Sequence, residues 1–441
     1  MSDISSRVPM FPTGTDTFRF DTSEPRIGRI RSTSFPTGVV MSASSQAPPV
    51  FPFDNSTVHH PDPLYARLRA EQPVTRVDFH GHEAWLVLGH EQARSVLADQ
   101  RFSLAEASKP HIPRLGTLSV PPGAILALDP PEHTRVRKLA TKAFTPRRIE
   151  ALRPRVREVV DELLADLVTT TPPVDLIERF TAPLPIRMIC EILGVPLSDQ
   201  KDFERWTELI TSVEGAPSEQ VQHGWESLRD YIAGLVAEKR RQPAEDLLSA
   251  LVEARDVDDR LDENELVLFG LMLLAAGHET TKNQLANSVL VLLGRHPEQW
   301  RALTHDPERV PAAVDELLRY ISLFNFDVTL PRVAVERVEV GGVTIEEGEV
   351  VLVALSAANR DEREFDRPNE LDVERRDNRH LAFGSGIHRC LGAQLAKLEL
   401  DVGLRGLVGA LPGLELAVAE DEVTWKTGSF IRAPRRLPVT W

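Results

Sequence analysis

Cysteine is scarce in this chain of 441 residues, which contains only Cys190 and Cys390. Two cysteines cannot build the set of disulfide bonds that holds small secreted domains together, and they cannot supply a zinc site made of four thiolates. So few cysteines are typical of proteins in a reducing compartment. We therefore expect a cytoplasmic protein, although a single Cys190–Cys390 bridge remains open.

Long hydrophobic runs and a signal sequence are also missing. The longest apolar run, Leu266 to Gly277, has twelve residues, fewer than the roughly 18–20 that cross a bilayer. The first residues do not combine a basic start, an apolar segment and a small-residue cleavage site. The sequence therefore predicts no membrane partner.

Positive charge is in deficit, since 51 Lys and Arg residues stand against 66 Asp and Glu residues and the formal net charge is -15. Such a molecule repels nucleic-acid phosphates unless it carries a local basic patch. None of the usual nucleic-acid-binding modules is visible in the sequence. We expect no nucleic-acid partner.

Leucine is absent from the first fifty residues, and the first leucine is Leu64. The same segment contains six prolines and many Ser and Thr residues, so it has too little apolar surface to offset its ordering entropy. We predict a disordered extension over residues 1–50. No linker or internal repeat interrupts residues 51–441, which we predict to form one large domain.

Hydrophobic periodicity predicts a mainly α fold with small β-sheets. Leucine- and alanine-rich amphipathic stretches, such as Arg148–Val168, dominate the chain. Strand patterns are few: Thr75–Leu88 alternates around a His80-Gly81 turn, and Val338–Leu355 resembles a hairpin with turns at Gly341-Gly342 and Glu347-Gly348.

The clearest single element is a helix predicted from Asp262 to Gly294. Asp262 is a good N-cap, Glu265 occupies the capping-box position, and Gly294 is a natural stop. Its middle, Leu266 to Ala276, is apolar on every face, which predicts a central buried helix.

Polar residues interrupt this helix at Ala276-Gly277-His278-Glu279-Thr280-Thr281. The Thr280 hydroxyl can compete for the Ala276 carbonyl and open the helix locally into a groove. A carboxylate beside a hydroxyl at such a groove could relay protons. Taken alone, the same residues could equally be a threonine-rich turn with a surface acid.

Two further motifs follow along the chain. Glu316 and Arg319 share a helix face at i,i+3, which by itself is ordinarily a solvated ion pair. Cys390 lies in the loop Phe383-Gly384-Ser385-Gly386-Ile387-His388-Arg389-Cys390-Leu391-Gly392, ahead of a helical stretch whose N-terminus favours a thiolate. A Cys390/His388 nucleophile is a competing interpretation, but the spacing suits it poorly. Cys190, in an apolar helical run, is expected to be a small buried hydrophobe.

Together, the three motifs resemble those of the cytochrome P-450 family of haem-thiolate enzymes. The family's Phe-x-x-Gly-x-x-x-Cys-x-Gly loop matches at Phe383, Gly386, Cys390 and Gly392. Its Ala-Gly-x-(Asp/Glu)-Thr groove and Glu-x-x-Arg pair match at Ala276, Gly277, Glu279, Thr280, Glu316 and Arg319. The resemblance covers roughly residues 61–441 and implies the multihelical cytochrome P-450 fold.

This resemblance also implies roles for individual residues. Cys390 would be the axial thiolate of a haem b iron, and Glu279 and Thr280 would deliver protons during dioxygen activation. The haem propionates would be bound by His133, Arg137, Arg332 and His388. Glu316, Arg319 and Arg375 would form a buried ionic cluster that supports the haem loop.

The resemblance implies a monooxygenase that inserts one oxygen atom from O2 into a mainly apolar small molecule in natural-product tailoring. Alternatives are oxidative radical coupling without oxygen insertion and, from another class, a haem-binding sensor without turnover. No flavin- or nicotinamide-binding motif is present, so a separate ferredoxin and its reductase would supply electrons. A basic face is expected to bind the ferredoxin: Arg135, Lys138, Lys142, Arg147, Arg148, Arg389 and Lys397. The expected substrate contacts are Met272, Ala276, Phe324, Phe326, Val328 and Phe430.

Overall fold

The computed structural model describes residues 47–53, 55–114, 120–121, 123–141, 144–211, 218–256, 261–328 and 330–441. The predicted N-terminal extension lies outside the described residues except for residues 47–50. Val50 is part of a strand that pairs with the sheet, and Pro48–Trp441 form one compact unit. No described helix is long and apolar enough to cross a membrane.

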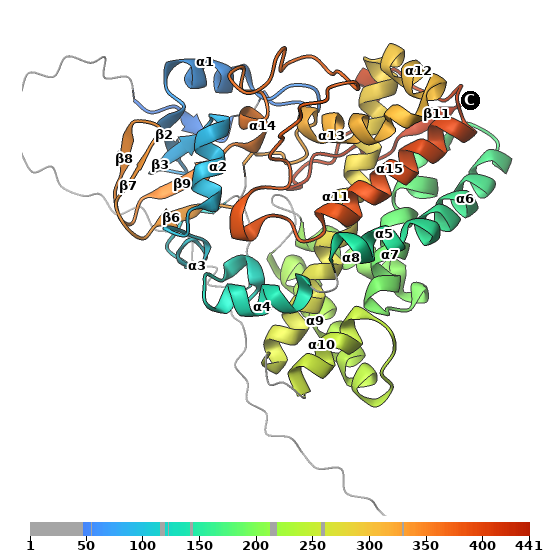
Figure 1. Ribbon diagram of the computed structural model, residues 1–441, viewed down its shortest axis with the longest axis horizontal. Coiled ribbons are helices and arrows are strands. Elements are labelled where there is room, and N and C mark those ends of the chain that lie inside the picture. Colours follow the sequence, from blue (N-terminus) through green and yellow to red (C-terminus); the bar gives the residue numbers. More distant parts are fainter. Residues whose placement is uncertain are drawn as a thin grey trace, which may run out of the picture. The chain divides into compact units, whose positions relative to one another are not determined.

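Helices make up most of the described chain, as the periodicity predicts (Figure 1). They are α1 (Pro63–Glu71), α2 (His90–Ala98), α3 (Leu104–Ala107), α4 (Glu132–Thr141), α5 (Pro146–Ala151), α6 (Arg153–Thr169), α7 (Pro183–Leu193), α8 (Gln200–Ile210), α9 (Ser218–Arg241), α10 (Leu247–Asp256), α11 (Glu263–Gly294), α12 (Pro297–His305), α13 (Val310–Tyr320), α14 (Leu355–Ala358) and α15 (Ala393–Ala410).

The strands form small sheets within the described residues. They are β1 (Val50–Phe51), β2 (Val74–Phe79), β3 (His82–Val87), β4 (Phe102–Ser103), β5 (Val174–Asp175), β6 (Arg332–Ala334), β7 (Val338–Val340), β8 (Val343–Ile345), β9 (Val350–Val353), β10 (Glu415–Leu416) and β11 (Pro438–Thr440). Six of them follow the order β1-β2-β3-β9-β6-β4, three the order β10-β11-β5, and β7 pairs with β8.

Two of the three predicted turns, His80-Gly81 and Gly341-Gly342, close hairpins. His80 and Gly81 connect β2 to β3 with positive φ angles of 56° and 81°, and Gly341 and Gly342 connect β7 to β8 with 56° and 84°. The prediction for Val338–Leu355 was wrong beyond Ile345, because β9 pairs with β3 and β6 and not with β8. All four residues of β9 are buried, so this apolar strand gains more burial inside the larger sheet than at the edge of a hairpin.

Helix α11 begins and ends as the sequence predicts. The Asp262 side chain accepts from the Glu265 N–H, and the Glu265 side chain accepts from the Asp262 N–H. The helix packs against α7, α9, α10 and α15 and reaches α12 at its end (Figure 1). Its apolar stretch is mostly buried, but Ala276 is exposed. This departure from the sequence pattern falls where the sequence predicts a groove.

The predicted amphipathic stretch Arg148–Val168 forms two helices instead of one. Helix α5 ends at Ala151, and α6 begins at Arg153 with Pro154 in its first turn. Proline has no N–H to donate and fits the first turn of a helix, where no such bond is needed. A new helix therefore begins at this point.

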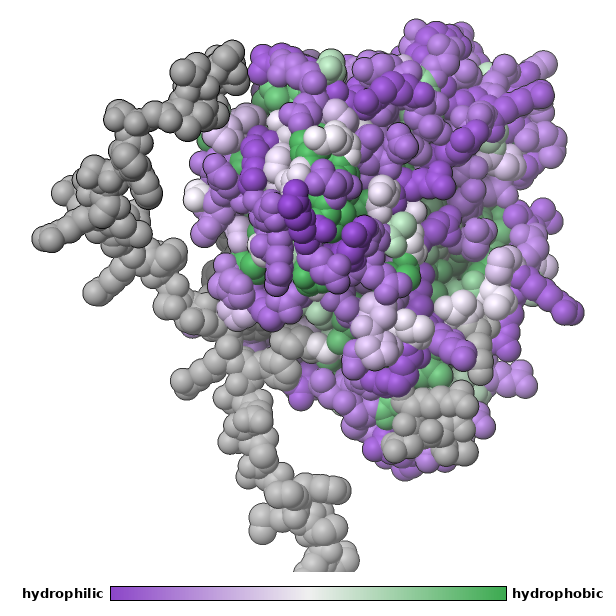
Figure 2. Space-filling view, turned by 60° about the vertical axis from the view of Figure 1, so that its left-hand side comes forward, coloured by the Kyte–Doolittle hydropathy of each residue, from purple (hydrophilic) through white to green (hydrophobic). Residues whose placement is uncertain are grey.

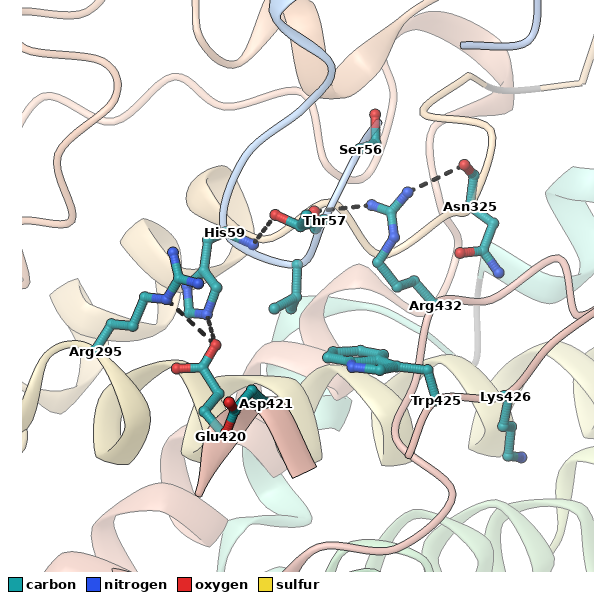
Figure 3. Close-up of a pocket in the computed structure, with 11 residues that line it drawn as sticks. Ser56, Thr57, His59, Arg295, Asn325, Glu420, Asp421, Trp425, Lys426 and Arg432 are labelled. Carbon is teal, nitrogen blue, oxygen red and sulfur yellow. Dashed lines mark hydrogen bonds and ion pairs between the residues drawn. The ribbon is translucent and has the colours of Figure 1, made fainter. Parts of the chain in front are cut away.

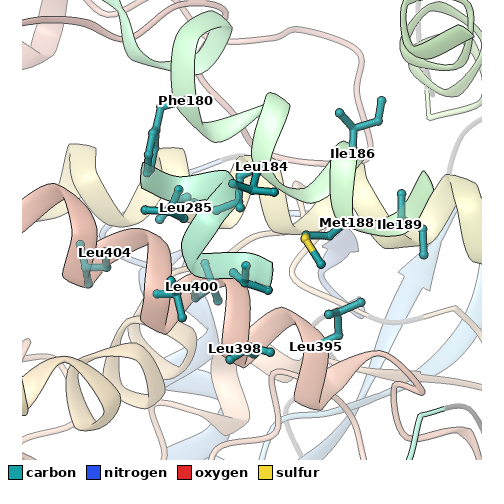
Figure 4. Packing of buried hydrophobic residues seen from close by; sticks show 14 of the residues in the cluster. Phe180, Leu184, Ile186, Met188, Ile189, Leu285, Leu395, Leu398, Leu400 and Leu404 are labelled. Carbon is teal, nitrogen blue, oxygen red and sulfur yellow. The ribbon is translucent and has the colours of Figure 1, made fainter. Parts of the chain in front are cut away.

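The main hydrophobic core lies where α7, α11 and α15 meet (Figure 4). Leu184 of α7, Leu285 of α11 and Leu400 of α15 are all buried in it. Gly403 allows the close packing, because a Cβ there would lie 3.1 Å from Leu184 Cδ2 and 3.3 Å from Leu285 Cδ2. The core therefore holds α15, which follows the Cys390 loop, directly against the central helix. The face in Figure 2 is mainly hydrophilic, with hydrophobic residues showing between polar ones.

Candidate active site

The loop that carries Cys390 is held by backbone contacts that only glycine allows. The Cys390 N–H donates to the Phe383 carbonyl at 2.9 Å. Gly386 has a φ of 71°, and a Cβ there would lie 2.3 Å from the Leu97 carbonyl oxygen of α2. Any other residue would be strained and would collide with backbone. The loop is therefore packed directly against the backbone at the end of α2.

The two cysteines have different surroundings. Cys190 is fully buried in the core, as expected, and burial raises its pKa to about 12. Cys390 has accessible surface, and neither thiol is in a disulfide. The possible Cys190–Cys390 bridge is therefore absent.

The thiol of Cys390 does not ionise readily by itself, contrary to the expectation from its position ahead of a helix. Desolvation by the surrounding protein raises its pKa, and the Gly392 N–H, Arg137 and Arg389 only partly oppose this effect. Desolvation thus has a larger effect on the pKa of Cys390 than the N–H group at the helix N-terminus. A metal ion deprotonates a thiol that coordinates it, so a thiolate here calls for a metal partner.

Four predicted propionate ligands converge, although they come from three parts of the chain. The rings of His133 in α4 and His388 lie 4.1 Å apart. Burial lowers the pKa of His388 to about 3, and His133, Arg332 and Arg137 lower it further in the same direction. These four groups therefore lie near enough to repel one another when charged.

Three of these four groups lack an acceptor among the described residues for at least one of their nitrogens. Both ring nitrogens of His133 and Nδ1 of His388 are buried without a hydrogen-bond partner among the described residues. Arg332 in β6 is 5% exposed and makes no ion pair within the described chain; burial lowers its pKa to about 10, with only Asp129 opposing. Arg137 donates to the Arg389 carbonyl. Buried donors left without acceptors are costly, and haem, with two carboxylates, fits this donor set.

At the position of the predicted groove, α11 continues as one unbroken helix from Glu263 to Gly294. The Thr280 hydroxyl donates to the Ala276 carbonyl at 2.9 Å, as expected. Ala276 is exposed and Thr280 half-buried. Gly277 admits a core side chain instead of a ligand, because a Cβ there would lie 2.8 Å from Ile189 Cγ1.

Glu279 is directed into a buried ionic cluster. Its side chain is 3% exposed and pairs with Lys282 and, at 3.3 Å, with Lys426. Asn283 Nδ2 donates to Glu279 Oε1 at 2.9 Å. Burial by itself would raise the pKa of Glu279, but the two ammonium groups hold it well below its usual range. The carboxylate is therefore ionised and is not hydrogen-bonded to Thr280.

Sequence reasoning missed the partners of Glu279. Lys282 stands three residues after Glu279, a spacing that places both on one helix face, so this signal was available. Lys426 is 147 residues away in the sequence, and no local pattern indicates that it returns to this helix.

The structure brings Glu316, Arg319 and Arg375 together as expected. Arg319 donates to Glu316 at 2.7 Å and 2.8 Å, and Arg375 Nε donates to Glu316 at 3.0 Å. Arg319 also donates to the carbonyls of Asn359, Pro368 and Glu370. The cluster thus ties α13 to the chain segment that precedes the Cys390 loop.

Most of the expected substrate residues have accessible surface. Met272, Phe324, Phe326 and Phe430 are half-buried. The rings of Phe324 and Phe430 stack 4.8 Å apart, and those of Phe326 and Phe430 lie 6.4 Å apart. Val328 is fully buried in the second hydrophobic cluster, so we leave it out of the pocket that we propose.

Comparison with known proteins gives consistent matches. A family model described as Cytochrome P450 matches residues 206–409. Nocardicin C N-oxygenase of Nocardia uniformis subsp. tsuyamanensis is 46% identical over 89% of this chain and 98% of its own. Mycinamicin IV hydroxylase/epoxidase of Micromonospora griseorubida is 43% identical over 90% of this chain and 100% of its own.

Solved structures agree with this fold. One cytochrome P450, described as having biaryl coupling reactivity, superposes with a TM-score of 0.83. It is 40% identical, and the match covers 88% of this chain and 99% of the other. The expected multihelical fold is confirmed.

Proposed function

Because the chain belongs to the cytochrome P450 family, and is therefore a haem-thiolate monooxygenase, we propose that it hydroxylates or epoxidises a mainly apolar small molecule in natural-product tailoring. The observation that supports this proposal is the break in burial along α11, where Ala276 is exposed and the half-buried Thr280 donates its hydroxyl to the Ala276 carbonyl. In this proposal the substrate and dioxygen lie at this point, within reach of a proton donor.

We assign the haem iron to Cys390, whose backbone is fixed by the Phe383 carbonyl. Haem, when bound, supplies the redox chemistry that cleaves dioxygen. His133, Arg137, Arg332 and His388 hold its two carboxylates. Arginine suits this task because its planar fork can pair bidentately with a carboxylate. Binding these anions provides acceptors for the ring nitrogens of His133 and His388, which are buried without a hydrogen-bond partner among the described residues.

Thr280 and Glu279 have different tasks in this proposal. Thr280 Oγ1 can rotate its proton from the Ala276 carbonyl towards the proposed substrate position, so it donates where the reaction takes place. Glu279 is ionised and held by lysines, so it accepts a proton from solvent before it can supply one. The hydroxyl is thus the donor at this position, and the carboxylate replenishes it.

Apolar surface dominates the proposed substrate pocket. Met272 and Ala276 lie on α11, while Phe324, Phe326 and Phe430 form a cluster of aromatic rings. Aromatic and aliphatic linings bind substrates mainly through apolar burial. A mainly apolar substrate therefore fits.

Cytochrome P450 enzymes take electrons from redox partners, and here we propose a ferredoxin with its reductase. Lys138, Arg147, Arg148 and Arg389 are exposed and form no ion pair with any described residue. Arg135 and Lys397 are engaged by Glu265 and Asp315, and Lys142 lies outside the described residues. Free cations can attract an acidic partner. The cytoplasmic location remains a prediction from cysteine content.

Radical coupling is the second candidate, because one similar structure is described as having biaryl coupling reactivity. Product formed under ¹⁸O2 distinguishes the two: oxygen insertion labels the product, and coupling leaves it unlabelled. A haem sensor without turnover would form neither a labelled nor an unlabelled product.

The proton donor is tested with Thr280→Ala. We expect haem and substrate binding to persist while reducing equivalents appear as hydrogen peroxide instead of product, with a loss of about 10²–10⁴-fold in product formation. Ser288→Ala is the matched control, because its hydroxyl also donates to the carbonyl four residues earlier in α11. Unchanged product yield in Thr280→Ala would contradict the assignment.

A further inference from the structure

Asp327 has a backbone conformation that is unusual for a residue with a side chain. Its φ is 57°, in the left-handed region, which Asp and Asn adopt more readily than other residues with a Cβ. Among the described residues other than glycine, positive φ angles also occur at His80 and Arg367, and both of these residues are exposed. Asp327 is only 3% exposed. Its conformation is therefore held by tertiary contacts, and such positions often have a function.

Asp327 connects three other segments of the chain. Its carboxylate accepts from the Ser56 hydroxyl, in the segment before α1, and from Arg432 Nη1 at 3.4 Å. Its backbone carbonyl accepts from Ser356 Oγ of α14 at 3.4 Å. A buried carboxylate is costly unless it is paired and hydrogen-bonded, and Asp327 meets both conditions.

Arg432 binds the same part of the chain through several carbonyl groups. Its Nη1 donates to the carbonyls of Thr57 and Ser322 at 3.1 Å and 3.0 Å. Its Nη2 donates to the Asn325 carbonyl at 3.1 Å, so the guanidinium group lies between the segment before α1 and Asn325 (Figure 3). Together with the pair to Asp327, these bonds hold the segment between Ser322 and Asp327 at three points.

The aromatic cluster of the proposed substrate pocket includes two rings from this segment. The Asp327 N–H donates to the Phe324 carbonyl at 3.0 Å, which closes a turn that contains Phe326. The Asn325 N–H donates to the Phe430 carbonyl at 3.0 Å, so the turn is also bonded to the third ring's backbone. The placement of the three rings relative to one another therefore depends on the backbone turn at Asp327.

Close packing does not replace these polar contacts on the side of Arg432. A cavity of about 610 Å³ lies there, and Asn325 and Arg432 line it together with Ser56 and Thr57 (Figure 3). Atoms that face a cavity lack packing partners on that side. The segment is therefore positioned mainly by the hydrogen bonds of Asp327 and Arg432.

We propose that Asp327 is a specificity-determining positioning residue, which sets the shape of the substrate pocket by fixing the placement of Phe324, Phe326 and Phe430. Its left-handed backbone turns the chain after Phe326, and its pair with Arg432 holds that turn in place. Asp327 acts through the rings and not by contact with the substrate, because its carboxylate is buried and paired. This inference rests on the substrate pocket proposed above.

The test measures how tightly the full-length holoenzyme binds two ligands of haem iron, imidazole and 4-phenylimidazole, by spectral titration. Imidazole needs only access to the iron, whereas the phenyl group of 4-phenylimidazole also needs apolar contacts beside it. We expect Asp327→Ala to raise the Kd of 4-phenylimidazole about 2–10-fold, the equivalent of one aromatic contact, and to leave the Kd of imidazole unchanged. A merely structural role of Asp327 would alter both Kd values alike.

Three further variants separate the backbone of Asp327 from its carboxylate. Asp327→Asn keeps an acceptor oxygen and tolerates positive φ, so its ratio of the two Kd values should stay closest to that of the wild type. Asp327→Gly keeps the left-handed backbone without a Cβ but removes the carboxylate, so we expect an intermediate increase, and it serves as the test if Asp327→Ala folds poorly. His80→Ala is the matched control, because exposed His80 has a φ of 56° in the β2–β3 turn, and it should leave both Kd values unchanged.

Failure of this inference is distinguishable from failure of the proposed pocket. Phe430→Ala removes one ring directly and should raise the Kd of 4-phenylimidazole without changing that of imidazole. If Phe430→Ala has this effect but Asp327→Ala and Asp327→Gly do not, the pocket stands and the role of Asp327 is refuted. If Phe430→Ala has no effect, the proposed pocket fails and this inference fails with it.

Discussion

Replacing Glu316 by leucine should destabilise the protein more than any other change in its ionic cluster. Glu316 accepts two hydrogen bonds from Arg319, one from Arg375, one from Asn378 Nδ2 and one from the Asp372 N–H. The side chains of Glu316 and Arg319 are 0% exposed. Removing the carboxylate leaves a fully buried guanidinium with only carbonyl acceptors.

The expected magnitude follows from these contacts. Breaking a buried ion pair by removing one partner costs about 3–5 kcal/mol, and Glu316→Leu should reach the upper end because two arginines lose their counter-ion. Arg375→Leu should cost about 1.5–3 kcal/mol, since it removes one charge-assisted bond to Glu316 while the pair with Arg319 remains. The double variant Glu316→Leu/Arg319→Leu should be more stable than Glu316→Leu, because it leaves no unpaired charge at position 319.

Urea unfolding of the haem-bound protein, followed by tryptophan fluorescence and haem absorbance, measures these free energies. Haem retention is recorded for each variant, since the cluster supports the segment before the Cys390 loop. Arg337→Leu, at an exposed side chain, serves as the control and should change little. If the double variant were no more stable than Glu316→Leu, the unpaired buried charge would not be the source of the loss.

Three further predictions concern other sites. Cys390→His should abolish the thiolate-specific absorption band of the reduced carbon-monoxide complex, and a variant that retained the band would exclude Cys390 as the ligand. Arg332→Met should speed haem loss to an acceptor protein roughly 10–100-fold, the equivalent of one charge-assisted hydrogen bond, while Arg337→Met leaves the rate unchanged. Glu399 is buried without a partner among the described residues, and burial raises its pKa well above the usual range. Above the usual carboxyl pKa the unfolded chain has lost this proton while the folded protein keeps it, so wild-type stability should fall as pH rises, up to the folded-state pKa. Relative to Glu399→Gln, urea unfolding should show a fall of up to about 1.4 kcal/mol per pH unit, and parallel pH profiles would contradict the neutral state.

Local sequence patterns were sufficient to predict the structural features that depend only on neighbouring residues. The capping box of Asp262 and Glu265, the His80-Gly81 turn and the back-bond from Thr280 to Ala276 each involve residues within four positions of one another. Their energies are set by local backbone geometry and hydrogen bonding. The ordered motifs around Glu279, Glu316 and Cys390 indicated the family through their resemblance to its motifs.

Contacts between residues far apart in the sequence were determined by the tertiary structure alone. The sequence indicated an acid–alcohol pair at Glu279 and Thr280, but not that Lys426 would arrive from 147 residues away and hold the carboxylate ionised. It also favoured a thiolate at Cys390 from the helix terminus, whereas desolvation raises the pKa of that thiol. Burial and ion pairing depend on which distant segments pack together. In a low-dielectric interior, these two effects shift the pKa of a group more than its neighbours in the sequence do. The sequence by itself determined which chemical groups are available, and the packing of α11 against the chain after α15 decided the burial and the ion pairing of Glu279.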